Sequence, residues 1–216
     1  MEKHPSQELQ NLYRNRNFQG ADPNSAKILF VGRDPNWAID IENMPVFAKV
    51  KEYLVDGVAF WNKHYIHHPF LLQEYKGDGK RYHRIFSKLE IDRNEADKIS
   101  FVELIGIPTT GMSMKNSKRF YDYLLSSSNI AHLKELDKLI NDTNKIIFIA
   151  WGLIQDFKII FAHTGLFSKF AKLNKDNFSI TELNQFENIF IHRHFSDAIS
   201  NSTINKISEK LKCHLK

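Results

Sequence analysis

The sequence has a single cysteine, Cys213, and no apolar run close to the length of about 20 residues that spans a bilayer. One cysteine cannot supply an internal disulfide framework, an iron–sulfur centre or a structural zinc site. The first ten residues, MEKHPSQELQ, also lack the apolar core of a signal peptide. These absences lead us to expect a cytoplasmic protein without a membrane partner.

Linkers, repeats and low-complexity tracts are absent as well, and the chain has 216 residues. That length is enough for one substantial core. The chain is 42% hydrophobic and 25% charged, as is typical of a globular protein. We expect one domain over residues 1–216, with residues 1–25 forming a peripheral N-terminal helix.

Positive charge exceeds negative charge, giving a formal net charge of +5 and a pI near 9.1. Such a balance favours acidic partners, because lysine and arginine gain affinity from phosphates through counterion release. The charges are spread along the chain rather than gathered in blocks. A basic surface that is merely solvated therefore stays an equal alternative.

Short apolar runs rich in β-forming residues predict buried strands. They are residues 27–31 (KILFV), 100–104 (SFVEL), 145–150 (KIIFIA) and 188–192 (NIFIH). Segments that we expect to be helical surround them: residues 6–16, 45–54, 81–89, 117–125, 130–140, 153–161 and 205–211. Strands alternating with helices favour parallel pairing. We predict a three-layer α/β/α sandwich around a central four-stranded parallel sheet.

Ligands of open parallel sheets bind beyond the carboxyl ends of the strands. The loops that begin at Gly32, Leu104, Trp151 and Arg193 are therefore expected to share one edge of the sheet. Residues 60–79 are the least regular part of the chain. They predict either a long loop over that edge or a buried loop packed by its aromatic residues.

The loop Gly32-Arg33-Asp34-Pro35 directly follows the first predicted strand. Glycine permits a tight turn and proline stiffens the exit, so Asp34 is held on a rigid loop. A carboxylate held in this way can orient a water molecule or stabilise a developing positive charge. The alternative is a simple turn in which Asp34 caps backbone N–H groups.

The segment His192-Arg193-His194-Phe195-Ser196-Asp197 follows the last predicted strand. A histidine at such a strand end can donate a hydrogen bond to an anionic leaving group, and Ser196 can contact a phosphate. By itself this segment equally fits a structural or exposed histidine.

Together the two segments resemble the paired motifs of the uracil-DNA glycosylase superfamily. Gly32-Arg33-Asp34-Pro35 is similar to its Gly-Gln-Asp-Pro loop, and His194-Phe195-Ser196 is similar to its His-Pro-Ser loop. Residues 145–152 and 79–86 add resemblance to its third strand and its basic helix, so that residues 27–200 are covered. The resemblance implies excision of a deaminated or damaged base such as uracil from DNA, by base flipping and without a cofactor.

Carried over by position, the resemblance implies that Asp34 activates the attacking water and that His194 stabilises the departing base. It places four residues around the base: Gly32, Arg33, Phe47 and Glu103. Phe47 would stack on the base, although a place in the core at a helix start is an equal alternative. It places Ser196 at a DNA phosphate. Thr109, Thr110 and Ser113 can offer further hydroxyl and N–H groups to a phosphate, although an ordinary loop and helix cap is an equal alternative for that segment.

Three residues depart from the family pattern. Glu103 stands where the family has an asparagine that reads the base edge. An ionised carboxylate only accepts hydrogen bonds, which suits an amino-bearing base better than uracil. Phe195 replaces the family proline, and Asp197 adds a negative charge beside the expected phosphate contact.

These departures keep other functions open. The chain is either a monomeric glycosylase acting on single- or double-stranded DNA, or an inactive domain of the same fold that binds nucleic acid or protein. A hydrolase of free nucleosides is the third alternative.

Four histidines lie close together in the sequence: His64, His67, His68 and His83. They lack the regular carboxylate or cysteine pattern that accompanies zinc sites. We therefore expect aromatic packing or contacts to DNA, and no metal. Trp37 and Trp151 are expected to be core or rim residues more than base-stacking groups.

Overall fold

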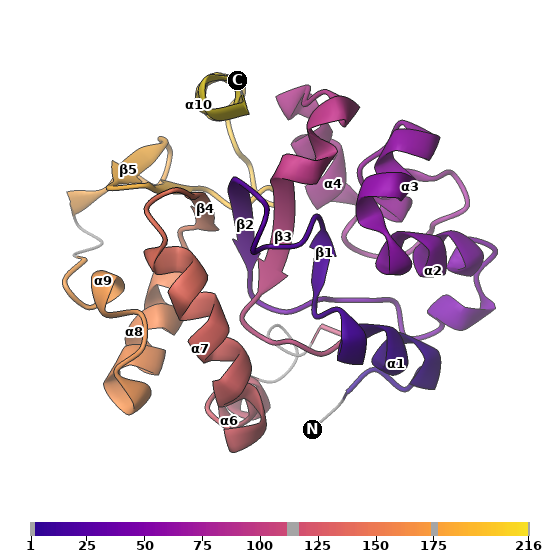
Figure 1. Cartoon of the computed structure of the whole chain (residues 1–216), viewed down its shortest axis with the longest axis horizontal. Helices are drawn as coiled ribbons and strands as arrows, with labels where there is room; N and C mark the ends of the chain where they lie inside the picture. Colours follow the sequence, from indigo (N-terminus) through magenta and orange to yellow (C-terminus); the bar gives the residue numbers. More distant parts are fainter. Residues whose placement is uncertain (1–2, 112–116, 174–176, 216) are drawn as a thin grey trace.

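The computed structural model describes residues 3–111, 117–173 and 177–215 and shows an α/β protein built on one mixed sheet (Figure 1). Its six strands have the spatial order β1-β3-β2-β4-β6-β5. The strands are β1 (Phe18–Gly20), β2 (Ile28–Gly32), β3 (Ile99–Glu103), β4 (Ile146–Ala150), β5 (Asn184–Phe186) and β6 (Ile189–His192).

The four strands predicted from the sequence form the core of this sheet. β3, β2, β4 and β6 pair in parallel in that order, and the arrowheads of β2 and β3 point the same way in Figure 1. The expectation of a sheet with only four strands is wrong, because β1 and β5 add antiparallel edges. Both edge strands have three residues and no continuous apolar run, and β1 lies in the N-terminal segment that we expected to be peripheral.

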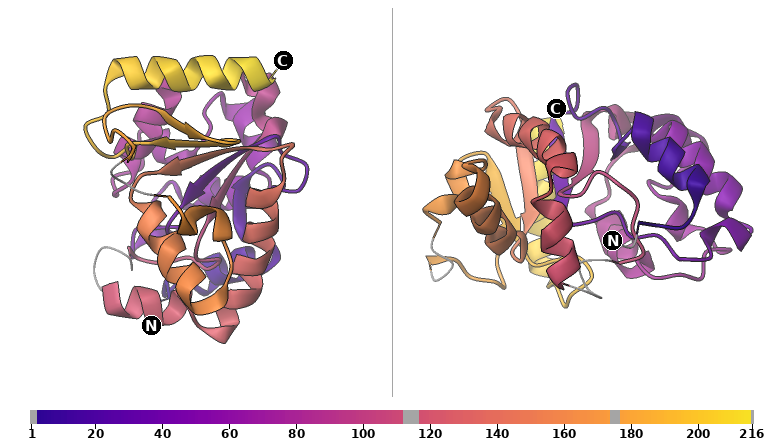
Figure 2. Two further views of the ribbon diagram at one scale, coloured as in Figure 1. Left: turned by 90° about the vertical axis from the view of Figure 1, so that its left-hand side faces the viewer. Right: turned by 90° about the horizontal axis from the view of Figure 1, so that it is seen from below.

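One face of the sheet is covered by helices from the second half of the chain. These helices are α6 (Ser117–Leu124), α7 (Ser127–Asn141), α8 (Leu153–Thr164) and α9 (Ser168–Ala171). Alternate strand residues such as Leu29 and Ile147 point into this layer and pack against helix residues such as Phe157. The left view of Figure 2 shows α7, α8 and α9 on the opposite side of the sheet from α10.

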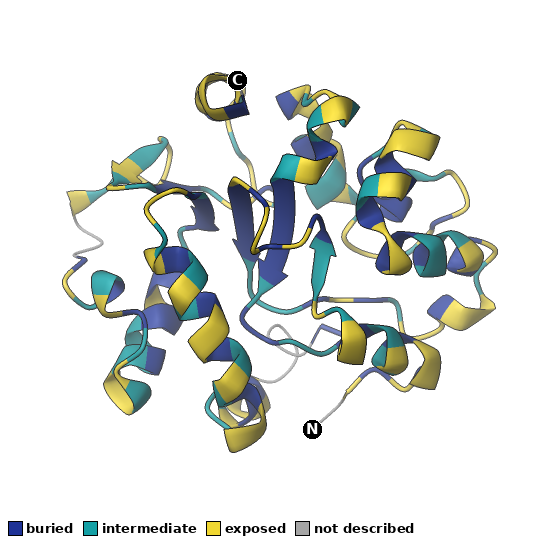
Figure 3. Cartoon of the chain, viewed as in Figure 1, coloured by how far each residue is buried: buried dark blue, intermediate teal, exposed yellow. Residues whose placement is uncertain are grey.

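The other face is covered by α4 (Lys80–Phe86), by the short 3₁₀ helices η3 (Ser87–Leu89) and η4 (Arg93–Lys98), and by α10 (Asn201–Leu215). The alternate residues of the strands meet here as a row of aromatic rings. The ring of Phe30 stacks on those of Phe148 and Phe101, with centroids 4.9 and 5.6 Å apart. Figure 3 shows the resulting burial of β2 and β3.

A third apolar cluster lies beyond the β1 edge. It is formed by α1 (Gln7–Asn15), η1 (Ile41–Asn43), α2 (Phe47–Val55), α3 (Gly57–His64) and η2 (Pro69–Leu71). Residues 60–79, which had two interpretations, belong to this cluster: Phe60, Phe70 and Tyr75 are buried in it. The segment is therefore packed by its aromatic residues. No helix in the described part of the chain is long and apolar enough to cross a membrane.

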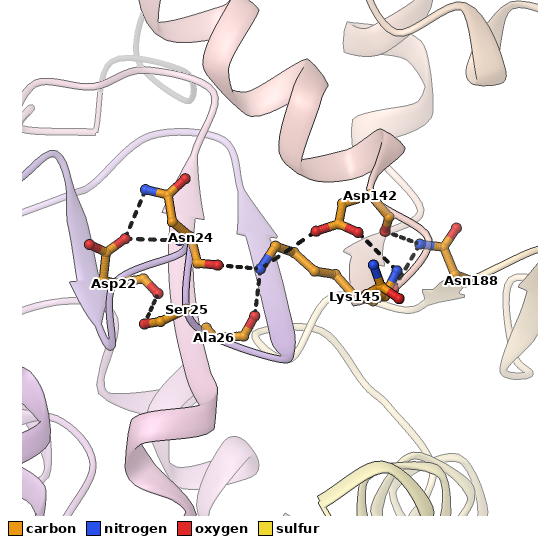
Figure 4. A network of polar contacts seen from close by, with 8 residues as sticks. Asp22, Asn24, Ser25, Ala26, Asp142, Lys145 and Asn188 are labelled. Carbon is orange, nitrogen blue, oxygen red and sulfur yellow. Dashed lines mark hydrogen bonds and ion pairs between the residues drawn. The ribbon is translucent and has the colours of Figure 1, made fainter.

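Lys145 joins the amino ends of the central strands. Its side chain is buried, and its Nζ donates hydrogen bonds to the carbonyl oxygens of Asn24 and Ala26, at 2.9 and 2.7 Å. Asp142 lies 3.9 Å from the same nitrogen, and Asn188 donates to the carbonyl oxygens of Asp142 and Lys145 (Figure 4). The ammonium group of Lys145 thus connects the segments that precede β2 and β4, and Asn188 connects the segment before β6 to the backbone of Lys145.

Replacing Lys145 by methionine should destabilise the fold by about 2 kcal/mol or more, because the buried carbonyl of Ala26 and the part-buried carbonyl of Asn24 lose their donor. Chemical denaturation with a two-state fit measures the change. Lys138→Met is the matched control: this exposed lysine pairs only with the exposed Glu135, and its loss should cost less than about 0.5 kcal/mol. Equal midpoints for the two variants would contradict the role of Lys145.

Candidate functional site at the strand ends

The carboxyl ends of the parallel strands lie at one edge of the sheet, as expected. β2 ends at Gly32, β3 at Glu103 and β6 at His192, and Gly32 pairs directly with Glu103 in the register. The loops that follow carry Asp34 and His194. Residues that are far apart in the sequence therefore meet where this class of fold binds its ligands.

Asp34 is fixed by Thr109. The hydroxyl of Thr109 donates a hydrogen bond to Oδ2 of Asp34 at 2.7 Å. The backbone of Thr109 also holds the loop, since its N–H donates to the carbonyl of Pro35 and its carbonyl accepts from the N–H of Trp37, both at 2.9 Å. Thr109 is fully buried, a position that suits the holding of Asp34 rather than the expected contact with a DNA phosphate.

Glu103 fills the space left by the missing side chain of Gly32. A Cβ added to Gly32 would overlap Oε2 of Glu103, so the carboxyl group lies directly over the glycine. The backbone carbonyl of Glu103 accepts a hydrogen bond from Nε2 of His132 at 2.7 Å. Among the described residues, none donates a hydrogen bond to the carboxyl oxygens. The half-buried carboxyl is therefore presented without a protein partner.

The surroundings of Glu103 favour its neutral form. Burial raises the pKa of Glu103 well above its usual range, and the negative charge of Asp34 raises it further. Burial also raises the pKa values of Tyr13, Tyr53 and Tyr82, and the charge of Glu103 contributes to all three. The charge of Glu103 is therefore felt by three tyrosines from separate helices. The hydroxyl of Tyr53 is buried and has no hydrogen-bond partner in the described structure.

This arrangement changes the expectation for Glu103. As an ionised group it would only accept hydrogen bonds and would suit an amino-bearing base. As a neutral acid it has one O–H donor and one carbonyl acceptor, the same pair that an asparagine amide offers. A neutral Glu103 therefore does not favour an amino-bearing base over uracil.

His194 is an exposed residue whose imidazole is oriented by its own loop. The backbone N–H of Ser196 donates to Nδ1 of His194 at 3.2 Å, so the neutral ring carries its hydrogen on Nε2. The ring lies 5.3 Å from that of Tyr82. Loss of surrounding water lowers the pKa of His194; Asp197 opposes this effect and Arg33 adds to it. His194 is therefore built as an Nε2–H donor.

Arg33 of the first motif loop is anchored to α8. Its Nε contacts Oδ2 of the buried Asp156 at 2.7 Å, and Tyr121 donates to the other oxygen of Asp156 at 2.8 Å. Its charge also lowers the pKa of His194. The side chain of Arg33 keeps 37% of its surface exposed, so a ligand can still reach it.

We group five residues at this edge as the strand-end cluster: Arg33, Asp34, Tyr82, Glu103 and His194. The charge of Asp34 raises the pKa of Glu103, and the charge of Glu103 raises that of Tyr82. The ring of Tyr82 lies 5.3 Å from that of His194, and the charge of Arg33 lowers the pKa of His194. Asp34 and His194, which the sequence motifs single out, thus follow parallel strands at the same edge of the sheet, with β4 between β2 and β6.

No family model, curated protein or solved structure matches this chain. The resemblance to the uracil-DNA glycosylase superfamily therefore rests on its short motifs and on the residues of the strand-end cluster.

Other residues expected at the site have different surroundings. Phe47 begins α2, is 9% exposed and packs in the third apolar cluster with Lys51 over its ring, which favours the packing role over base stacking. Thr110 is nearly buried, whereas Ser196 is partly exposed beside His194. Ser113 lies outside the described residues.

The three tyrosines around Glu103 were not predicted. Tyr82 lies in the basic segment that the resemblance includes, but nothing in that motif marks its side chain. Tyr13 and Tyr53 belong to α1 and α2, which reach the cluster only through tertiary packing. Trp37 is buried and donates from Nε1 to the hydroxyl of Tyr13 at 3.0 Å, so it fixes the position of that tyrosine.

Two small cavities lie elsewhere in the described structure. One, of about 100 Å³, is lined in part by His67, and the other, of about 140 Å³, is lined in part by Tyr13. Neither is bordered by Asp34, Glu103 or His194. These two cavities are therefore separate from the strand-end cluster.

Three of the four clustered histidines are packed together in the interior. Nε2 of His67 and Nδ1 of His83 are 3.1 Å apart, and the rings of His68 and His83 stack with centroids 3.6 Å apart. Nδ1 of His68 accepts from the N–H of Phe70, so its Nε2–H donates to Gln19. Burial lowers the pKa of His67 to about 3 and those of His68 and His83 well below the usual range.

These histidines serve as aromatic packing, one of the two roles expected for them. Among the described residues, no group of three or more histidine, cysteine, aspartate and glutamate side chains is placed to hold a metal ion.

The buried histidines predict loss of stability in acid. Their pKa is near 6.5 in the unfolded chain and lower in the folded protein, so their contribution is complete above pH 6.5. It falls as the pH drops below 6.5 towards the native value of about 3 for His67, by about 1.4 kcal/mol per pH unit for each histidine.

Denaturation curves between pH 7 and pH 4 measure this dependence. The slope of the unfolding free energy against pH gives the number of protons that the chain takes up on unfolding. His67→Phe should reduce this number by about one. The exposed His163 on α8 provides the control, because its replacement by glutamine should leave the slope as in the wild type. A slope that His67→Phe does not change would refute the assignment.

Proposed function

We propose that this protein hydrolyses the N-glycosidic bond of a deaminated or damaged base in DNA. The observation that carries the proposal is that the loops of Asp34 and His194 both leave the carboxyl edge of the sheet, after the parallel strands β2 and β6. Their loops resemble the two catalytic motifs of the uracil-DNA glycosylase superfamily. The three-layer arrangement with four parallel strands at its centre is the one that this resemblance implies.

Asp34 is suited to act on the attacking water. Its carboxylate is oriented by the hydroxyl of Thr109, and its loop is held by the backbone bonds of the same residue. A carboxylate fixed in this way accepts a proton as the water oxygen bonds to the sugar carbon, and its charge stabilises the positive sugar that forms as the base leaves.

His194 is suited to act on the leaving base. The N–H of Ser196 occupies Nδ1, so the hydrogen on Nε2 is directed away from the loop. An Nε2–H group can donate to a carbonyl oxygen of the base as negative charge accumulates there. The lowered pKa of His194 favours this neutral donor over a charged imidazolium at neutral pH.

DNA is the proposed partner, in single- or double-stranded form. Arg33 keeps part of its side chain exposed at the cluster, and Ser196 is partly exposed beside it. These groups, with the net charge of +5, favour contact with a phosphate backbone. The base has to leave the helical stack to reach Asp34 and His194.

An inactive domain that binds nucleic acid or protein is the second candidate. It is favoured by the two cavities, neither of which borders Asp34 or His194, and by Phe195, which is fully buried where the family has a proline. This candidate predicts DNA binding that weakens steeply with salt and is accompanied by no release of base.

Oligonucleotides containing uracil, hypoxanthine, xanthine or alkylated bases test the glycosylase. Incubation with the protein should produce alkali-labile sites at one or more of these bases, read as strand breaks on a gel. Asp34→Asn and His194→Ala should each slow release by about 10²-fold or more, because each removes a group that acts in the transition state.

Asp40→Asn and His163→Ala are the matched controls, since both residues are exposed and lie outside the strand-end cluster. They should release base at the wild-type rate. Activity that survives both Asp34→Asn and His194→Ala would overturn the assigned roles, and wild-type protein that binds DNA but releases no base would support the inactive domain.

A further inference from the structure

Asp34 and Glu103 form a pair of carboxyl groups in contrasting surroundings. They lie at the ends of two hydrogen-bonded strands, where Gly32 pairs with Glu103 and Asp34 follows two residues later. Asp34 accepts a hydrogen bond from Thr109. The carboxyl of Glu103 accepts none from the described residues and lies over Gly32. The roles proposed for Asp34 and His194 leave Glu103 unused.

We propose that Glu103 is a catalytic general acid that gives its carboxyl proton to the departing base, and that the substrate is therefore a deaminated purine. This inference rests on the proposed glycosylase function. Hydrolysis of a glycosidic bond commonly uses two carboxyl groups, one that protonates the leaving group and one that acts on the water. A pair whose surroundings separate their proton affinities supplies these two roles.

The position of Glu103 suits the acid role. Its carboxyl lies over Gly32 and, in the described part of the chain, has no ion-pair partner and accepts no hydrogen bond. His132 of α7 is occupied by the backbone carbonyl of Glu103. Burial and the negative charge of Asp34 both raise the pKa of the carboxyl and favour the protonated acid.

Hydrolysis of the N-glycosidic bond then proceeds as follows for Glu103 and Asp34. The proton of the Glu103 carboxyl moves to a ring nitrogen of the base, and the electron pair of the bond between the sugar carbon and the base moves onto the base. The oxygen of water bonds to the sugar carbon and its proton moves to Asp34. The products are a neutral base and an abasic sugar, and the proton on Asp34 returns through solvent to Glu103.

The acid role selects the class of base. A purine that leaves through N9 carries other ring nitrogens, N3 and N7, that a carboxylic acid can protonate. Uracil leaves through N1 and offers only carbonyl oxygens, so it departs as an anion and gains less from an acid. Hypoxanthine and xanthine are deaminated purines with protonatable nitrogens, and they are the bases that this geometry favours.

Single-turnover release of hypoxanthine and of uracil by wild-type protein and Glu103→Gln tests the proposal. Glutamine has the shape, the donor and the acceptor of the neutral acid but no proton to transfer. Hypoxanthine release should fall by about 10²-fold or more, and uracil release should fall less. In the wild type, hypoxanthine release should also decline at high pH as Glu103 ionises, and this decline should be missing in the variant.

A second variant moves the carboxyl without changing its chemistry. Gly32→Ala puts a methyl group where Oε2 of Glu103 lies, and the carboxyl has to swing away. Hypoxanthine release should fall in this variant too. Glu209→Gln, an exposed change on α10, is the control and should behave as the wild type. Thermal unfolding and DNA binding by anisotropy establish that each variant is folded and that the loss lies in the rate.

The measurements separate three outcomes. If Glu103→Gln releases hypoxanthine at the wild-type rate and with the same pH profile, the acid role of Glu103 is overturned and the glycosylase function stands. Glu103 then contributes at most hydrogen bonds to the base. Release of uracil but not of hypoxanthine overturns the substrate class. Wild-type protein that releases neither base overturns the glycosylase function, and the acid role falls with it.

Discussion

A missing side chain at Gly32 is the constraint on which the arrangement of the strand-end cluster depends. β2 and β3 pair in parallel, so the last residue of one strand lies beside the last residue of the other. Because Gly32 has no Cβ, the carboxyl of Glu103 lies over the backbone of β2 instead of turning towards solvent. In that position its pKa is raised by burial and by the negative charge of Asp34 from the next loop. One small residue therefore determines where the carboxyl of Glu103 lies.

The rest of the cluster gives these acidic groups different electrostatic surroundings. Thr109 connects the Asp34 loop to the segment after β3 and supplies the hydroxyl that its carboxylate needs. The aromatic wall around Glu103 supplies no ion pair among the described residues, so burial dominates there. Arg33 and His194 add positive charge and an Nε2–H donor at the same edge of the sheet. The roles proposed for these residues rest on this contrast between the two carboxyl groups.

The central strands could be predicted because each is a continuous apolar run buried on both faces, and their parallel order then places the loops of Asp34 and His194 at one edge of the sheet. The edge strands could not, since β1 and β5 have a partner on one side only and need no apolar run. Phe47 has the right residue type for stacking, but its exposure depends on how α2 packs. The raised pKa of Glu103 was equally hidden, because it depends on the burial of this side chain and on Asp34 from another part of the chain.

The short edge strands also bear on how the molecule behaves among its own copies. A long, flat edge offers a row of unpaired amide and carbonyl groups onto which another chain can add. Here the parallel core ends on each side in a strand of only three residues, and β1 is followed at once by a turn at Gly20. Little backbone is left to template growth of the sheet. The short edge strands β1 and β5 therefore give another chain few backbone groups with which to extend the sheet.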